Sequence, residues 1–169
     1  MRHRVLAYPT ESCYGLGCDP QSRLAVRRIL RLKRRPQSKG LILIASRPEQ
    51  LRRYVTPEAL QAAVASGYWP GPVTLLLAAS KRCPVWLRGK HQTIAVRVTA
   101  HVPAVKLCRR LGMAVVSTSA NRSGQHALRS AREVHRVFGK QVQVMPGRIG
   151  YAKRPSKIVN LMTKQVVRS

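Results

Sequence analysis

Short apolar runs alternate along the chain with longer segments that have helical spacing. The runs have the period-two or continuous apolar character of buried strands, and they predict strands at residues 5–8, 41–45, 73–79, 93–98, 114–117, 142–145 and 158–161. Strands that alternate with helices favour an α/β fold with an open sheet over a helical bundle or a β-sandwich. Because no repeat or low-complexity stretch divides the sequence, we expect a single domain over residues 1–169.

Four segments carry the start and stop signals of helices. Two helices are expected to begin at a capping residue followed by proline: Asp19-Pro20 and Thr56-Pro57. A third is expected from about residue 103 to residue 111, and the fourth begins at the capping box of Ser130 and Glu133. The expected stops of the last three helices are glycines: Gly67, Gly112 and Gly139.

The strongly basic charge of the chain favours some classes of function over others. The 169 residues include 32 Lys+Arg and 5 Asp+Glu, which gives a formal net charge of +27. The five acidic residues are too scattered for a paired-carboxylate site, which weighs against glycosidase-type and two-metal chemistry. We therefore expect phosphate-rich partners, with a nucleotide and RNA both eligible. The alternative is a surface that is basic only through compositional bias.

The sequence shows neither an export signal nor a membrane anchor. No apolar run approaches the roughly 18 residues that span a bilayer, and the apolar stretch at the N-terminus is too short for a signal peptide. The four cysteines form no C-x-x-C pair. We therefore expect a cytoplasmic protein with reduced thiols, no metal site of its own and no membrane partner.

Two polar segments follow predicted strands and are candidates for ligand binding. Residues 8–17, Y-P-T-E-S-C-Y-G-L-G, are rich in hydroxyls and hold two glycines that let backbone approach a ligand closely. Residues 117–124, S-T-S-A-N-R-S-G, concentrate hydroxyl and amide groups that can bond to phosphate or ribose oxygens. The structural alternatives are an ordinary strand-to-helix turn for the first segment and a polar loop without a ligand for the second.

The first predicted helix is strongly basic. Seven cations fall within residues 23–35, and Lys33 is expected on the same face as Val26, Ile29 and Leu30. Like charges four residues apart destabilise an isolated helix, so an anionic partner is expected to compensate. The alternative is a solvated basic face that the helix dipole favours near the C-terminal end.

Six motifs occur in a fixed order along nearly all of the chain. They are Y-P-T-E-S-x-Y-G-L-G, L-K-x-R-P, W-P-G-P-V-T, A-V-R-V-T-x-H, S-T-S-A-N-x-S-G and P-S-K-I-V. Their order and spacing closely resemble the YrdC/TsaC family of threonylcarbamoyl-AMP synthases. The resemblance implies a twisted, mixed, open sheet flanked by helices around a deep basic cavity. It also implies a short, single-domain form that lacks the helix normally found ahead of the first strand.

The resemblance implies an enzyme of the nucleotidyltransferase class. It would combine L-threonine, bicarbonate and ATP into L-threonylcarbamoyladenylate and pyrophosphate, with Mg²⁺ carried in by the ATP substrate. Downstream transfer proteins would then place the threonylcarbamoyl group on tRNAs that read ANN codons. Binding of tRNA or double-stranded RNA through the basic surface is a further expectation.

The resemblance also assigns roles to individual residues. Lys33 and Arg35 would grip the triphosphate and are the expected catalytic pair, and Lys39 falls on the same substrate-facing loop. The expected ATP site consists of Lys33, Arg35, Thr74, Ser119 and Asn121. The expected L-threonine site consists of Thr10, Arg97, Ser117 and Ser156. Since the carbamate of threonine is itself the nucleophile, no covalent residue is needed.

Two other functions compete with synthesis. A non-catalytic, degenerate YrdC-like module that binds double-stranded RNA or tRNA would explain the charge, but it would not need the intact set of site residues. A carbamoyl-adenylate step, like that of the YrdC-like domain in hydrogenase maturation factors, is the weaker option because those proteins are much longer.

Overall fold

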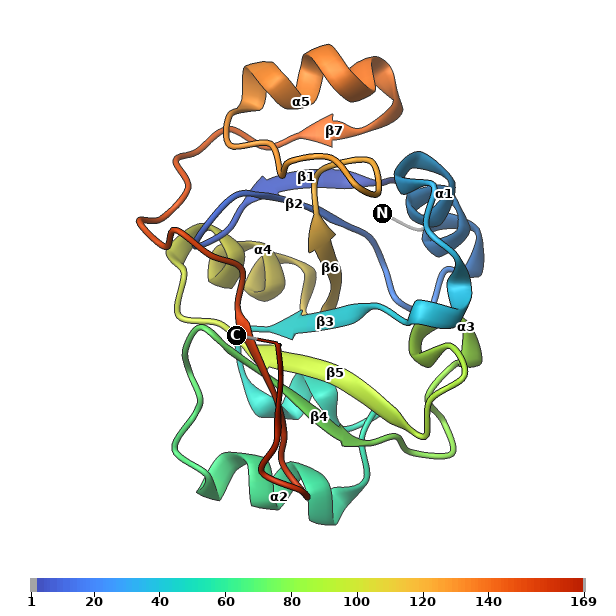
Figure 1. Cartoon of the computed structure of the whole chain (residues 1–169), viewed down its shortest axis with the longest axis vertical. Helices are drawn as coiled ribbons and strands as arrows, with labels where there is room; N and C mark the ends of the chain where they lie inside the picture. The colour runs from blue at the N-terminus through green and yellow to red at the C-terminus, as the bar shows by residue number, and fades with distance from the viewer. Residues whose placement is uncertain (1–2, 169) are drawn as a thin grey trace.

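A mixed sheet forms the centre of the molecule (Figure 1). The strands are β1 (Leu6–Pro9), β2 (Tyr14–Gly17), β3 (Ile42–Ala45), β4 (Val73–Ala78), β5 (Thr93–Val98), β6 (Val115–Ser119), β7 (Gln143–Val144), β8 (Lys157–Asn160) and β9 (Val166–Arg168). The computed structural model describes residues 3–168, and within them the strands form one nine-stranded sheet in the order β7-β1-β2-β6-β3-β5-β4-β8-β9. The pairs β1–β7, β3–β5 and β4–β8 are parallel, and the other neighbours are antiparallel.

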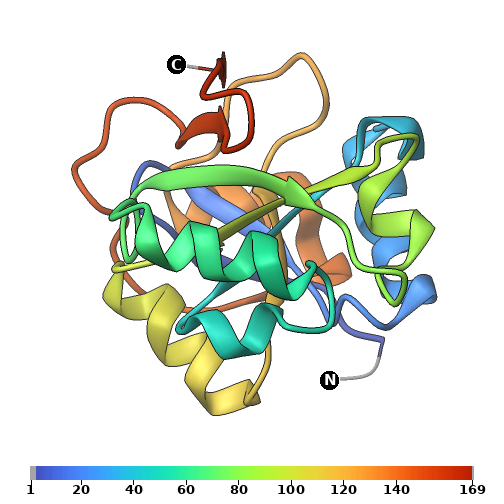
Figure 2. The same ribbon diagram turned by 90° about the horizontal axis from the view of Figure 1, so that it is seen from below.

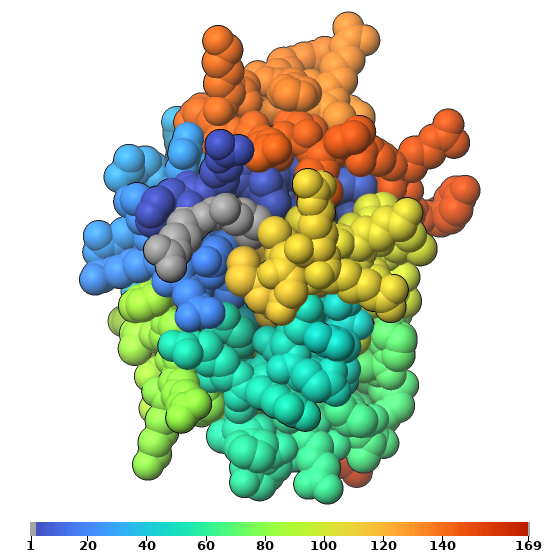
Figure 3. Space-filling view, turned by 180° about the vertical axis from the view of Figure 1, so that it is seen from behind, coloured from blue at the N-terminus to red at the C-terminus, as the bar shows by residue number. Residues whose placement is uncertain are grey.

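Helices flank this sheet. They are α1 (Arg23–Lys33), α2 (Pro57–Ala65), α3 (Val85–Arg88), α4 (Val102–Leu111) and α5 (Ala131–Phe138), with short 3₁₀ turns η1 (Gln37–Lys39), η2 (Pro48–Leu51) and η3 (Gly139–Gln141). Helix α4 packs against β1 and β3, α2 against β4, and α5 against β7. Seen from below, α2 and α4 lie on the same side of β4, away from the C-terminal strands (Figure 2). From behind, α4 occupies the middle of the surface, with the η2–α2 region beneath it (Figure 3). The predicted α/β class with a mixed, open sheet and flanking helices is confirmed.

Most of the predicted elements are present. Each of the seven predicted strands is found, with ends that shift by two residues at most. The second, third and fourth helices are also found, and Ser130 and Glu133 form the predicted capping box. Gly112 ends α4 with φ of 67°, a left-handed conformation that suits glycine.

The predicted N-cap of the first helix is wrong. Ser22, not Asp19, caps α1, since its side chain accepts a hydrogen bond from the backbone N–H of Ala25. The carboxylate of Asp19 instead accepts from the N–H of Gln21 at 2.8 Å, which forms a separate turn ahead of the helix. Ser22 lies three residues after Asp19 and directly precedes Arg23, the first residue of the helix.

Strand β2 was not predicted, because its Y-G-L-G sequence reads as a turn. The strand is buried along its whole length and pairs with both β1 and β6. Gly17 is required for packing: a Cβ there would lie 2.7 Å from Cε1 of Tyr8 and 2.7 Å from the carbonyl oxygen of Val116. Glycine therefore marks a close approach between strands at this position. The segments β9 and α3 were also not predicted.

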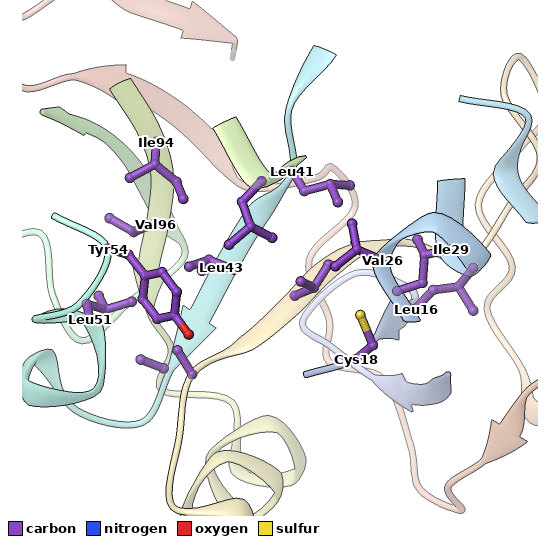
Figure 4. Close-up of a cluster of buried hydrophobic side chains, with 14 of the residues drawn as sticks. Leu16, Cys18, Val26, Ile29, Leu41, Leu43, Leu51, Tyr54, Ile94 and Val96 are labelled. Atoms are coloured by element: carbon purple, nitrogen blue, oxygen red, sulfur yellow. The ribbon is translucent and has the colours of Figure 1, made fainter. Parts of the chain in front are cut away.

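The apolar core has two parts. In the larger part, Val26 and Ile29 of α1 pack with Leu16 of β2, and the cluster continues through Leu43 and Val96 in the middle of the sheet (Figure 4). The smaller part lies under α4 and includes Tyr8, Ile44 and Leu107. These contacts fix the C-terminal end of α1 against the sheet, where Lys33 is located.

The described residues contain no helix that is both long enough and apolar enough to span a bilayer. The four cysteines are buried free thiols: Cys13, Cys18, Cys83 and Cys108.

Candidate active site

A polar cavity of about 320 Å³ opens beside the turn between β1 and β2. Its wall includes that turn, the end of α1, β5, β6 and the loop after β6. Five of its lining residues are cations: Lys33, Arg35, Lys39, Arg97 and Arg168. None of the lining residues within the described part of the chain is acidic. Such a surface favours an anionic ligand.

The structure brings together most of the site residues predicted from the sequence. Eight of the nine line this one cavity: Thr10, Lys33, Arg35, Arg97, Ser117, Ser119, Asn121 and Ser156. The ninth, Thr74, is fully buried and is not among the lining residues. Its hydroxyl lies 2.9 Å from the hydroxyl of Ser156, so Thr74 supports the wall from behind.

The spacing of the K-x-R motif follows from how α1 ends. Arg34 adopts a left-handed conformation with φ of 50°, its N–H donates to the carbonyl oxygen of Arg31, and the N–H of Arg35 donates to that of Leu30. This C-cap reverses the chain after Lys33. As a result Lys33 and Arg35 both face the cavity, while Arg34 is exposed.

Lys33 is a buried cation that neutral oxygen atoms surround. Its side chain is 3% exposed, and its ammonium donates to the carbonyl oxygen of Ser119 and, at 3.0 Å each, to the carbonyl oxygen and Oδ1 of Asn121. Burial, together with the nearby charge of Arg35, lowers the pKa of Lys33 to about 8. Its three N–H donors therefore hold the loop after β6 without a carboxylate to neutralise the charge.

The side-chain amide of Asn121 is fixed on both sides. Its Oδ1 accepts from the hydroxyl of Ser119 at 2.6 Å, while its Nδ2 donates to the carbonyl oxygens of Arg122 and Gln125. Together with Lys33, these bonds connect the L-K-x-R-P motif to the S-T-S-A-N motif, 88 residues away. The loop is thus held in one conformation at the cavity wall.

Arg97 of β5 is the second buried cation, and it has a carboxylate partner. Its Nη2 lies 3.1 Å from Oε2 of Glu11, and the other oxygen of Glu11 accepts from the hydroxyl of Thr99 at 2.8 Å. Glu11 follows Thr10 in the turn between β1 and β2, and Thr10 lines the cavity. The Tyr8 hydroxyl donates to Ser117 at 2.8 Å and so orients a further lining hydroxyl.

Sequence reasoning missed Arg168. This residue of β9 lines the cavity, and its guanidinium donates to the carbonyl oxygen of Ser156 at 2.7 Å and to the Ser156 hydroxyl at 3.2 Å. Burial, and then repulsion from Arg97 and Arg35, lowers its pKa. The signal in the sequence is weak, a single arginine after two valines near the end of the chain.

A second cavity of about 240 Å³ adjoins the first. The two share Arg35, Lys39, Leu41, Ile42 and Arg168 on their walls. The rest of the second wall is largely apolar and includes Leu76, Leu87, Ile94, Ile158 and Val167. A ligand with one polyanionic part and one flat apolar part would match this pair of cavities.

The described residues contain no cluster of three or more His, Cys, Asp or Glu side chains that could hold a metal ion. The side chains that line the cavity include hydroxyl, amide and cationic groups, which can donate hydrogen bonds to an anion.

Known proteins similar to this chain include curated enzymes and solved structures. A protein named threonylcarbamoyl-AMP synthase from Methylobacillus flagellatus is 54% identical over 167 residues, which is 97% of this chain and 92% of that protein. A protein of the same name from Chromobacterium violaceum is 55% identical over 165 residues, which is 97% of this chain and 86% of that protein. The crystal structure of P. abyssi Sua5 complexed with L-threonine matches with a TM-score of 0.84 and 34% identity over 94% of this chain. This chain spans about half of the length of that Sua5 chain, 47%.

A family model also covers the sequence. The Sua5/YciO/YrdC model, described as Telomere recombination, matches residues 2–169. Both the matched length and the identity to the curated relatives agree with the resemblance seen in the motifs. The chain belongs to the Sua5/YciO/YrdC family.

Proposed function

We propose that this chain synthesises threonylcarbamoyl-AMP and pyrophosphate from L-threonine, bicarbonate and ATP in the cytoplasm. The observation that carries the proposal is that eight of the nine expected site residues line a single cavity with five cations. The names of the close relatives support the same activity.

The two adjoining cavities suggest how the substrates lie. The triphosphate of ATP would bind at Lys33, Arg35 and Arg168, and the adenine would enter the apolar neighbouring cavity. L-threonine would lie at the Arg97 end of the cavity, with its carboxylate at Arg97 and its other groups near the hydroxyls of Thr10 and Ser117. Ser156, which is hydrogen-bonded to Arg168, would lie between the two substrates. The relative from P. abyssi is a protein crystallised with L-threonine, which supports a threonine site in this fold.

The chemistry then needs positioning and charge stabilisation. The amino group of L-threonine and bicarbonate form a carbamate with loss of water. A carbamate oxygen bonds to the α-phosphorus of ATP, the bond from that phosphorus to the bridging oxygen breaks, and pyrophosphate leaves. Lys33 and Arg35 stabilise the negative charge on the phosphate oxygens, and the amide of Asn121 holds Lys33 and Ser119 in position.

Mg²⁺ belongs to the ATP substrate in this proposal. It commonly bridges phosphate oxygens and keeps several of its waters, so a dedicated protein cage is not required. The hydroxyl oxygens of the cavity can accept hydrogen bonds from the waters of such an ion.

We also propose that the product passes to proteins that modify tRNA, and that tRNA or double-stranded RNA contacts the basic surface. Exposed arginines of α1 support such a contact: Arg23, Arg27, Arg28 and Arg31. Affinity for RNA should fall steeply with salt, because each neutralised phosphate releases counterions. A salt titration with tRNA measures this slope.

Pyrophosphate release with and without L-threonine and bicarbonate tests the proposed synthesis, with mass detection of threonylcarbamoyl-AMP. We expect product only when all three substrates are present, and none from the folded double variant Lys33→Ala/Arg35→Ala. Folded wild-type protein that binds RNA but makes no product would instead support the non-catalytic RNA-binding module.

A further inference from the structure

The only ion pair within residues 3–168 joins Glu11 to Arg97. This is notable in a chain with 32 Lys+Arg and 5 Asp+Glu. The other four acidic residues serve local backbone structure: Asp19 accepts from a nearby N–H, Glu133 completes a capping box, and Glu49 and Glu58 lie in the first turns of η2 and α2. Glu11 alone is placed against a cation of the candidate active site.

The pair makes contact through one oxygen of the carboxylate. Thr99, which is 1% exposed, donates to Oε1 of Glu11, and Nη2 of Arg97 lies 3.1 Å from Oε2. Oε2 of Glu11 and Nε of Arg97 are both buried without a hydrogen-bond partner, so the contact is an ion pair and not a two-pronged hydrogen bond. Arg97 lines the cavity, whereas Glu11 is not among the lining residues. Glu11 therefore acts on the cavity through Arg97.

Glu11 also connects Arg97 to the segment that carries Ser156. The backbone carbonyl of Glu11 accepts from the N–H of Ala152 at 3.0 Å, and that of Thr10 accepts from Gly150 at 2.9 Å. A Cβ at Gly150 would lie 2.7 Å from the carbonyl oxygen of Glu11, so these two backbone segments are in close contact. Glu11 thus contacts Arg97 through its side chain and the segment ahead of Ser156 through its backbone.

We propose that Glu11 is a positioning residue that makes the Arg97 end of the cavity selective for L-threonine over a polyphosphate. It holds the guanidinium in place and compensates its charge, so that this end suits a zwitterion with a single carboxylate. The Lys33 end has no carboxylate against it and keeps its positive charge for the triphosphate. This inference rests on the proposed assignment of L-threonine to the Arg97 end.

Glu11→Gln tests the proposal, since it keeps the size of the side chain and removes its charge. In steady-state synthesis, we expect the KM for L-threonine to rise about tenfold, which corresponds to about 1.4 kcal/mol, with little change in kcat or in the KM for ATP. We also expect pyrophosphate to become a competitive inhibitor against L-threonine. A purely structural role would not create this new competition. Glu58→Gln, at an exposed position on α2, removes the same charge and should leave both properties unchanged.

Thr99→Val is the second variant, in case Glu11→Gln does not fold. It removes the hydrogen bond to Glu11 but no charge, and a smaller rise in the KM for L-threonine is expected. Calorimetric titration of L-threonine and of pyrophosphate gives a readout that does not depend on turnover. If wild-type protein makes product and the variants keep wild-type threonine affinity without pyrophosphate competition, the inference is overturned while the proposed function stands. If wild-type protein neither binds L-threonine nor makes product, both are overturned.

Discussion

Lys33 and Arg97 are both almost fully buried cations on the wall of the same cavity, 3% and 6% exposed, but their partners differ. Lys33 donates to the neutral oxygens of Ser119 and Asn121. Arg97 lies against the carboxylate of Glu11. Burial of either charge is unfavourable unless hydrogen bonds or an opposite charge compensate it, and the protein uses a different solution for each cation.

The difference teaches how one cavity can distinguish two anionic substrates. Neutral acceptors solvate Lys33 but leave its charge available to a ligand, whereas the carboxylate beside Arg97 cancels much of the charge at that end. A triphosphate is drawn to uncompensated charge, and a small zwitterion does not need it. The five predictions that follow test this contrast.

The largest effect is expected from Lys33→Met. This variant removes the uncompensated charge and frees Asn121, so synthesis should fall by about a hundredfold to a thousandfold, as for loss of a donor that stabilises transition-state charge. Pyrophosphate release measures the loss, and circular dichroism checks the fold. Activity close to that of the wild type would refute the assigned role of Lys33.

Arg97→Met is expected to act on stability as well as on activity. It leaves the carboxylate of Glu11 without its cation, which should lower the free energy of unfolding by about 3 kcal/mol. Urea denaturation measures this, and the double variant Glu11→Met/Arg97→Met should recover most of the loss. Lys33→Met is the matched comparison, because it leaves no opposite charge unpaired; the loop oxygens lose their donor, so the free energy of unfolding should fall by a smaller amount, about 1 kcal/mol. Equal destabilisation by both single variants would contradict the contrast.

Asn121→Asp would make the Lys33 end resemble the Arg97 end. A carboxylate would then face Lys33, and the KM for ATP should rise about tenfold, the effect of about 1.4 kcal/mol, while the KM for L-threonine stays the same. Steady-state kinetics with each substrate varied in turn separates the two effects. A rise in the KM for L-threonine alone would reverse the proposed orientation of the substrates.

The last two predictions concern pH, and the first of them is a pH dependence of stability. Because burial lowers the pKa of Lys33 from 10.5 to about 8, the unfolded chain binds more protons at this group than the folded one between those values. The unfavourable contribution of the buried charge is fully present below about pH 8, and this group should make the protein more stable as pH rises toward 10.5. Urea denaturation across this range, compared between wild type and Lys33→Met, isolates the effect. A difference between the two proteins that does not vary with pH would contradict it.

The same shift predicts the opposite trend for ligand binding. ATP affinity should decrease as pH rises through about 8, since Lys33 loses the charge that attracts the triphosphate. Calorimetric titration of ATP in the same buffers measures it, and Lys33→Met should show a flatter profile.

Much of the fold could be predicted because its strands are apolar and its helices carry local caps. The capping box at Ser130 and Glu133 is an example of a signal contained in four residues. Strand β2 could not be predicted, because Gly17 is explained only by its close packing against Tyr8 and Val116 on neighbouring strands. The N-cap of α1 was predicted at Asp19, but the helix begins at Arg23 and Ser22 caps it.

The candidate site shows a similar division. Eight of the residues that the family motifs indicated do line one cavity. The motifs lie on strands and loops that the sheet brings together. Thr74 faces Ser156 and not the cavity, a distinction that depends on which side of β4 faces inward. The position of Arg168 at the cavity, and the ion pair between Glu11 and Arg97, both depend on contacts between segments far apart in the sequence. A local sequence pattern does not predict such contacts.

The bonds between Lys33 and the loop of Ser119 and Asn121 have an evolutionary consequence. Loss of Lys33 leaves the oxygens of that loop without their donor, and loss of Asn121 leaves a buried ammonium short of an acceptor. A mutation in either motif therefore weakens the selection that maintains the other. A descendant that abandoned synthesis would be expected to lose both motifs in quick succession, while the residues of the apolar core continued to preserve the fold.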